Sequence, residues 1–391
     1  MSDATTPAEA AWVQAFGNLP VEEGIALREG DSSRLFPATD PVRHAGLLGI
    51  ADIDAFLATD AARAPRLSMA LGTREGSAAV PQDDYLHEDD RADLPRLFAA
   101  FDAGATLILS QFHEVHPALA RFCRGLEQVF LHPVQANIYL TPPGAQGFRM
   151  HYDTHDVLVL QVMGEKHWRI WPGQPVPQPT RRTPWKNGIE PLAEAQSLTL
   201  RPGDTLYVPR GVLHDAQAHE GNEPSLHITI GLMEPSFAAV LRLALDLLES
   251  EDPALRRAFP TWRLAEGPGA LAALAQPLAA RLAEPAALER TALAWLDRLA
   301  MERPALLGRG LFVANPTEDT RLRLTPAVLH ALVPEPSGGA TLRWAGAPIA
   351  LSDSETAWVE ALAEGTTPAA LGGGALAFCT RLLRLGLVQA G

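Results

Sequence analysis

Residues 135–235 constrain the fold of this chain most strongly, because they consist of short apolar runs separated by turn-forming residues. The runs are NIYL, VLVLQVM, HWRIW, SLTL, TLYVP and LHITIGL, and the segments between them include TPPG, PGQPVPQP, RPGD and PRG. Many short strands at such spacing are typical of a β-sandwich or barrel. Only Gly164-Glu165 separates VLVLQVM from KHWRIW, which predicts a two-residue hairpin in which Met163 and Lys166 pair.

Helical patterns flank this β region on both sides. Before it, Phe112, Leu119, Phe122 and Leu126 recur at helical spacing and predict a helix over 110–128, whereas the acidic run 83–93 predicts a solvated loop. After it, SFAAVLRLALDLLES and AALERTALAWLDRLA have the amphipathic period of packed helices. The last part, from about residue 305, mixes strand-like and helical pieces, as a small α+β domain of winged-helix type does. We therefore predict three parts, which cover residues 1–234, 235–302 and 303–391.

Composition narrows the class of protein. A chain of 391 residues is too long for one compact core, and 47% hydrophobic with 20% charged residues is typical of a soluble globular protein. No run approaches twenty apolar residues and MSDATTPAEA does not resemble a signal peptide, so we expect no membrane span and a cytoplasmic location. Two cysteines, Cys123 and Cys379, are too few for a disulfide framework or a cysteine zinc site.

The formal net charge of −14 argues against general binding to nucleic-acid phosphates, so we expect no nucleic-acid partner. It is compatible with a basic protein or peptide as partner.

His151-Tyr152-Asp153 carries the main chemical signal. Side chains alternate along a strand, so the imidazole and the carboxylate of an HxD pair point to the same face. His214 follows at the end of RPGDTLYVPRGVLHDA and can add a second imidazole from a distant strand. Two histidines and one carboxylate form a facial triad that leaves metal positions open for a chelating cosubstrate and dioxygen.

The same HxD spacing occurs a second time, at His87-Glu88-Asp89. That copy lies in the acidic run and has no β pattern around it. With 12 histidines in the chain, such a spacing also arises by chance. We interpret His87 and Asp89 as loop surface, and His155 and His219 likewise as surface histidines.

Lys166 begins the strand after the predicted turn. Its hairpin partner Met163 shares parity with His151 and Asp153, which predicts a lysine on the same inner face. A buried lysine needs an anion, and the distal carboxylate of 2-oxoglutarate is a suitable one. The alternative is an ordinary hairpin lysine in solvent.

Five segments in order resemble one known family. They are Asn137-Ile-Tyr139-Leu-Thr-Pro, His151-Tyr-Asp153, Leu160-Gln-Val-Met-Gly-Glu-Lys166-His-Trp168-Arg, Pro202-Gly-Asp-Thr-Leu-Tyr-Val-Pro-Arg-Gly-Val-Leu-His214 and Leu226-His-Ile-Thr229. Over about a hundred residues this sequence resembles the JmjC-domain oxygenases, in particular their ribosomal oxygenase branch. The resemblance implies a mainly β cupin (double-stranded β-helix, jelly-roll) barrel with an α/β lead-in, a helical dimerisation segment at 235–302 and a C-terminal winged-helix domain.

The resemblance also implies an activity, the hydroxylation of a protein or peptide side chain, with a ribosomal protein as substrate. In that mapping His151, Asp153 and His214 bind Fe(II), and Lys166 binds the far carboxylate of the cosubstrate 2-oxoglutarate. Asn137, Tyr139 and Thr229 would line the cosubstrate or substrate side of the barrel, although inward-facing strand residues can also simply fill a barrel. The helical segment would form a homodimer.

Two departures from the family concern the substrate side. Thr154-His155 follows the HxD motif where relatives usually carry an acidic residue, and Gly231 stands where they tend to have serine. A tailoring hydroxylase of a biosynthetic peptide or small molecule is therefore one alternative. A metal-binding cupin or regulator without catalysis is another, and a histone demethylase is less favoured because the chain has no histone-reader segment.

Overall fold

The chain folds into two compact units, Met1–Glu234 and Pro235–Gly391. The structure is a computed structural model that describes residues 6–73, 76–183, 188–221, 223–301, 313–326, 328–335 and 337–391. The predicted boundary between residues 302 and 303 lies outside the described residues. Among the residues described, no helix combines the length and the apolar character needed to cross a bilayer.

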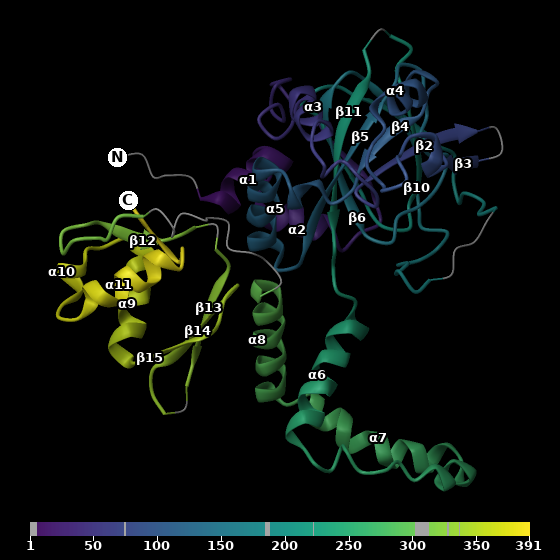
Figure 1. Ribbon diagram of the computed structural model, residues 1–391. Helices are drawn as coiled ribbons and strands as arrows, with labels where there is room; N and C mark the ends of the chain where they lie inside the picture. Colours follow the sequence, from purple (N-terminus) through teal and green to yellow (C-terminus); the bar gives the residue numbers. More distant parts are fainter. Residues whose placement is uncertain are drawn as a thin grey trace. The chain divides into compact units, whose positions relative to one another are not determined.

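The first unit contains two antiparallel sheets, and helices pack around them (Figure 1). Its helices are α1 (Pro7–Phe16), α2 (Val21–Leu27), α3 (Ile50–Leu57), α4 (Leu94–Asp102) and α5 (Pro117–Phe130), with 3-10 turns η1 (Gln82–Asp84) and η2 (Phe112–Glu114). Its strands are β1 (Arg34–Phe36), β2 (Leu67–Thr73), β3 (Gly76–Ala79), β4 (Thr106–Leu109), β5 (Val134–Thr141), β6 (Asp156–Met163), β7 (Lys166–Trp171), β8 (Gln196–Leu200), β9 (Thr205–Val208), β10 (Leu213–Ala218) and β11 (Ser225–Leu232). The larger sheet has the order β1-β9-β6-β11-β5-β4-β2-β3, and the smaller one has the order β10-β7-β8.

Strand β11 shows how the sequence separates the two faces of the larger sheet. Leu226, Ile228, Ile230 and Leu232 alternate with His227, Thr229 and Gly231. The aliphatic set is buried in the core that also holds the apolar sides of α1 and α5, and these two helices lie together beside the sheet (Figure 1). The polar set is left on the opposite face, because successive side chains of a strand point to opposite faces.

That opposite face packs against the smaller sheet. One apolar cluster joins Val157, Val159 and Leu206 of the larger sheet to Trp168 and Ile170 of the smaller one. The first unit is therefore two facing sheets with a layer between them, as the short apolar runs predict for a sandwich or barrel.

The predicted hairpin between Met163 and Lys166 is wrong. Met163 pairs with Leu226 in the larger sheet, whereas Lys166 pairs with Ala218 and Leu200 in the smaller one. The Gly164-Glu165 link carries the chain from one sheet to the other. Gly164 has a φ of +63°, and a Cβ on it would lie 2.4 Å from the Pro224 carbonyl oxygen, so glycine is needed for this close crossing.

The helix predicted over 110–128 begins later than expected. A 3-10 turn occupies Phe112–Glu114, and α5 runs from Pro117 to Phe130. Proline lacks the N–H that a helix interior needs but suits the first helical position, so Pro117 sets the start. The apolar spacing was informative about the buried face and less so about the boundary.

The second unit contains helices followed by a small α+β part. Its helices are α6 (Phe237–Glu251), α7 (Pro268–Leu282), α8 (Pro285–Met301), α9 (Asp353–Glu364), α10 (Pro368–Leu371) and α11 (Ala375–Arg384), with the 3-10 turn η3 (Thr261–Glu266). Its strands are β12 (Leu322–Leu324), β13 (His330–Pro334), β14 (Ala340–Trp344), β15 (Ile349–Leu351) and β16 (Val388–Ala390). β13, β14 and β15 form one antiparallel sheet, and β12 pairs with β16. A core of its own, which includes Leu342, Leu362 and Leu382, supports the α+β part.

Candidate active site

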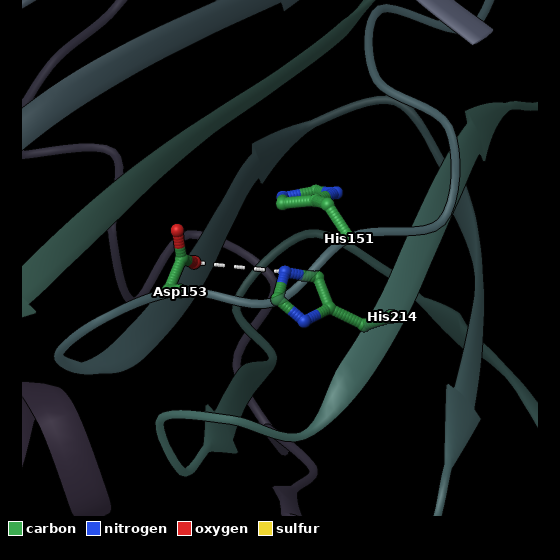
Figure 2. A group of neighbouring side chains, drawn as sticks. All are labelled: His151, Asp153 and His214. Atoms are coloured by element: carbon green, nitrogen blue, oxygen red, sulfur yellow. Dashed lines mark ion pairs between the residues drawn. The ribbon is translucent and has the colours of Figure 1, made fainter. Parts of the chain in front are cut away.

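Three potential metal ligands meet at the edge where the two sheets join. Ligand atoms of His151, Asp153 and His214 all lie within 4.8 Å of one another, and the side chains point toward a common centre (Figure 2). Of the residues that the structure describes, these are the only three His, Cys, Asp or Glu side chains grouped so closely. The Nε2 atom of His214 lies 3.6 Å from Oδ2 of Asp153.

The backbone fixes the two histidines relative to each other. The His151 N–H donates to the His214 carbonyl at 3.0 Å, and the His214 N–H donates back to the His151 carbonyl at 2.8 Å. This isolated bridge brings segments 63 residues apart in sequence side by side. The Gly211 N–H donates to the Asp153 carbonyl at 3.0 Å, which ties the third ligand to the same turn.

The hydrogen bonds of the two imidazole rings engage Nδ1 and leave Nε2 available to bind a metal. Nδ1 of His151 lies 2.8 Å from the Arg149 carbonyl, and Nδ1 of His214 lies 3.0 Å from the Val212 carbonyl. A carbonyl only accepts, so each Nδ1 must carry the proton, and each Nε2 presents a lone pair. Burial and the nearby His151 lower the pKa of His214 to about 4, so this imidazole is neutral at neutral pH, as a metal ligand must be.

A buried carboxylate braces the loop behind the ligands. Asp156 accepts hydrogen bonds from the Tyr207 hydroxyl at 2.7 Å and from the Arg210 N–H at 2.9 Å. Arg210 immediately precedes the glycine that binds Asp153, so Asp156 links the two loops that carry the ligands. Arg28 and Arg210 both form ion pairs with Glu234 and extend this brace to α2 and the end of β11.

A cavity of about 190 Å³ adjoins the three ligands between the sheets. Tyr139, Thr229 and His227 line it from the larger sheet, and Lys166 and Trp168 line it from the smaller one. The predicted inward position of Lys166 is therefore what the structure shows, although the hairpin argument for it is wrong. Asn137 does not line this cavity; its side-chain oxygen accepts the Gln111 N–H at 2.9 Å, and it lines another hollow.

Lys166 is a buried cation that forms no ion pair with a carboxylate among the residues that the structure describes. Its side chain is 4% exposed, and Nζ donates to the Thr141 hydroxyl at 3.0 Å and lies 3.4 Å from Nδ1 of His227. Burial alone lowers the pKa of Lys166 to about 7. Burial and the neighbouring Lys166 also lower the pKa of His227, which keeps that ring neutral beside the ammonium group.

Trp168 adds a second donor to the same cavity. Its Nε1–H is buried and has no hydrogen-bond partner among the described residues. An uncompensated ammonium group and an unpaired N–H are costly to bury and together favour an anionic ligand. Sequence reasoning did not assign roles to Trp168 or His227, although the alternation in LHITIGL already placed His227 on the polar face.

The two departures on the substrate side are one structural feature. A Cβ placed on Gly231 would lie 2.8 Å from Nε2 of His155 and 3.0 Å from Cγ of Gln135. The His155 ring therefore occupies the space that a side chain at position 231 would need. The prediction that His155 is an ordinary surface histidine is corrected, since its ring packs on β11.

Comparisons with known proteins found a family model and curated relatives that match this chain. Residues 108–240 match the JmjC domain family. The chain is 30% identical over 236 residues to the bifunctional lysine-specific demethylase and histidyl-hydroxylase NO66 of Culex quinquefasciatus, which covers 58% of this chain and 35% of that protein. It is 37% identical over 158 residues to ribosomal oxygenase 2 of Bos taurus, which covers 39% of this chain and 32% of that protein. The chain thus spans about a third of the length of these curated relatives.

A solved structure has the same fold. The ribosomal oxygenase YcfD of Escherichia coli superposes with a TM-score of 0.53 over 96% of this chain and 99% of its own, at 16% sequence identity. YcfD has also been solved in complex with cobalt and 2-oxoglutarate. The cupin-type fold, mainly β with helices, is therefore confirmed. The match of residues 108–240 to the JmjC domain family and the similarity to the curated relatives confirm the predicted resemblance of this chain to the ribosomal oxygenases.

Proposed function

We propose that this protein is an Fe(II)- and 2-oxoglutarate-dependent hydroxylase that acts on a side chain of a protein or peptide. The observation that carries the proposal is the pairing of the His151, Asp153 and His214 cluster with the buried, carboxylate-free Lys166 in one cavity. A metal site alone would fit many cupins. An adjacent cation without a counter-ion calls for an anionic cosubstrate as well.

The donor set fits ferrous iron. Two neutral imidazoles and one carboxylate on one side leave coordination positions open on the other, and Mn(II), Co(II) or Ni(II) would fit the same ligands. Bound iron would supply the oxidising chemistry, in which dioxygen and 2-oxoglutarate yield succinate, carbon dioxide and one oxygen atom for a substrate C–H bond. The protein holds the reactants in position and keeps water out of the cavity.

Lys166 would bind the far carboxylate of 2-oxoglutarate, with Trp168 and Thr141 as neighbouring donors. Tyr139 stacks on His227 with ring centroids 4.9 Å apart and an angle of 7°, which closes one side of that subsite. Thr229 lines the same cavity and shares the face of β11 with His227. Asn137 would act nearer the substrate, since it lines another hollow and not the cavity at the metal ligands.

The relatives suggest a ribosomal protein as the substrate. The names of the two curated relatives include histidyl-hydroxylase and ribosomal oxygenase, and the fold is that of a ribosomal oxygenase. The His155 ring over Gly231 favours a second candidate, a tailoring hydroxylase of a biosynthetic peptide or small molecule, because it changes the surface on the substrate side. A cupin without catalysis would bind metal and produce no succinate.

We also propose that α6, α7 and α8 form a homodimer interface and that the α+β part of the second unit is a winged-helix domain. Phe237, Leu241 and Leu245 of α6 recur at four-residue spacing, and their exposures are 90%, 53% and 37%. A stripe of this kind usually marks a surface that is covered by a partner. Light scattering at micromolar concentration should give the dimer mass, whereas a monomer would contradict the interface. The cytoplasmic location stays a prediction.

The activity is tested with Fe(II)-loaded protein prepared without oxygen. We expect succinate to form from 2-oxoglutarate when oxygen is admitted, and more to form when a ribosomal protein fraction is added. Mass spectrometry of that fraction should find a peptide with the mass gain of one oxygen atom. Succinate without such a peptide would favour the tailoring enzyme, and an iron-loaded protein that forms no succinate would contradict the hydroxylase.

A further inference from the structure

A second hollow lies beside the metal centre and carries arginines but no carboxylates. Its volume is about 700 Å³, compared with about 190 Å³ for the cavity at the metal ligands. Arg63, Arg66 and Arg181 line it together with the polar residues Gln111, Gln135 and Asn137, and none of its lining residues is acidic. We call this hollow the arginine groove.

The arginine groove continues the inner face that lines the cavity. On β5, Gln135, Asn137 and Tyr139 alternate with core residues and so share one face. Asn137 of the groove pairs across the sheet with Thr229, which lines the cavity. Tyr139, two residues further along β5, also lines the cavity, so an extended chain in the groove would run directly toward the metal ligands.

The wall of the groove is held in place without a ligand. Arg66 donates to the Ser110 and Gln111 carbonyls at 3.3 and 2.6 Å and forms an ion pair with Glu114 at 2.9 Å. Gln111 has a φ of +51°, and its N–H donates to the Asn137 side chain. Such preorganisation lowers the entropy cost of binding.

Two of the arginines differ from Arg66 because they form no direct ion pair among the described residues, although Arg63 is close enough to Asp89 to lower the pKa of that carboxyl. Arg63 and Arg181 are exposed, and neither forms an ion pair with a residue that the structure describes. Among the described residues, the Arg63 side chain donates only to the Asp60 carbonyl. In a chain with 46 acidic and 32 basic residues, a groove lined by three arginines and no carboxylate selects by charge.

We propose that the arginine groove binds a segment of the substrate polypeptide that carries carboxylates next to the residue presented to the metal centre. The proposal rests on the proposed hydroxylase function and names a feature of its substrate. Arginine binds carboxylates in a bidentate fashion, and Gln135 and Asn137 offer amides for the backbone of an extended chain. A nucleic acid fits less well, because the strongly negative chain opposes a long polyanion outside the groove.

The test uses three fluorescein-labelled probes, hexaglutamate, hexaglutamine and hexalysine, and fluorescence anisotropy with the full chain. Hexaglutamate should bind, and its affinity should fall between about 50 mM and about 300 mM NaCl, because exposed charge pairs are screened by salt. In the variant Arg63→Gln/Arg181→Gln its affinity should fall about tenfold, as expected for the loss of charge-assisted contacts. The matched control Arg121→Gln/Arg182→Gln removes the same charge from exposed positions outside the groove and should change affinity less than about twofold.

The proposal is overturned if hexaglutamate fails to bind, if it binds both variants equally, or if hexalysine binds more tightly. Tighter binding of an octathymidylate through the same two arginines would make the groove a nucleic-acid site instead. Succinate formation by the wild-type protein is measured separately. If hexaglutamate binds but no succinate forms, the proposed hydroxylase activity is contradicted and the proposed carboxylate binding in the groove is supported. If succinate forms but hexaglutamate does not bind, the hydroxylase activity is supported and the carboxylate binding is contradicted.

Discussion

Two segments of this chain share the HxD spacing and differ in everything else. His87 and Asp89 lie in a turn with side chains 53% and 54% exposed, and Asp89 binds Arg91 at 2.7 Å. His151 and Asp153 lie at the junction of two sheets, and His214 joins them from β10. No third ligand joins the first pair within the described part of the chain, whereas the second pair is joined by a neutral imidazole whose Nε2 carries a lone pair.

The difference shows that spacing supplies only two potential ligands. A backbone bridge brings His214 to His151, and burial keeps its ring neutral, so topology and desolvation complete the site. If this contrast holds, substitutions at the two HxD segments should differ strongly in their effects on metal binding.

Replacement of His214, the third ligand, should give the largest difference in metal binding between the two HxD segments. In His214→Ala, two ligands remain, and we expect metal affinity and 2-oxoglutarate turnover to fall by a factor of about 100 or more. In His87→Ala both should remain at the wild-type level. Titration with Mn(II), followed by electron paramagnetic resonance, measures the affinity, and equal loss in both variants would contradict the contrast.

Lys166→Met should affect the cosubstrate and the stability in opposite directions. Loss of the ammonium group should weaken 2-oxoglutarate binding about 30- to 100-fold, since a charge-assisted pair in a buried site contributes about 2–3 kcal/mol. The apo protein should become more stable at neutral pH, by a few degrees in Tm, because a buried charge without a partner is removed. Calorimetric titration and thermal unfolding measure the two effects; a less stable apo protein would contradict the uncompensated charge.

The affinity for 2-oxoglutarate should decrease as pH rises above neutrality. Burial lowers the pKa of Lys166 to about 7, so the ammonium form is present below this pH and is lost above it. Binding above pH 7 must then take up one proton, and the affinity should fall by up to about tenfold per pH unit. In Lys166→Arg, whose charge persists, we expect little change over the same range; a parallel fall would assign the effect to another group.

The contact between His155 and Gly231 should give a smaller, measurable coupling. Gly231→Ser alone should destabilise the protein by about 1–3 kcal/mol, because its Cβ would meet the His155 ring. His155→Ala should remove most of that cost in the double variant. Urea unfolding of the four proteins gives the coupling energy, and additive effects would show that the two positions are independent.

Asp89→Asn should have the smallest effect. Exposed ion pairs contribute about 0–1 kcal/mol, so stability, metal content and succinate formation should all stay close to the wild type. A loss of metal in this variant would show that the second HxD segment also binds an ion.

The sequence predicted the site better than the local connections. The HxD motif, the RPGD segment that ends at His214 and the family resemblance named the three ligands and Lys166, although the hairpin argument for Lys166 was wrong. It could not show that β6 and β7 belong to different sheets, since a two-residue link suits both a hairpin and a crossing between sheets. The close approach of Gly164 to the Pro224 carbonyl accompanies the crossing between the two sheets. This contact involves a residue 60 positions away in sequence, so the local sequence did not reveal it.

The sequence was also silent on contacts between distant segments. The departures at His155 and Gly231 were two separate observations until the fold placed the ring on the glycine. The counter-ion state of Lys166 likewise depends on which carboxylates are near it in space. Such properties arise from packing and are not encoded in any local pattern.

A crystal structure of the protein grown with Mn(II) and 2-oxoglutarate tests the central claim most directly. The account predicts an anomalous scattering peak coordinated by His151, Asp153 and His214, with the distal carboxylate of 2-oxoglutarate bound to Lys166. A metal at His87 and Asp89, or a 2-oxoglutarate molecule that leaves Lys166 without an anion, would contradict it.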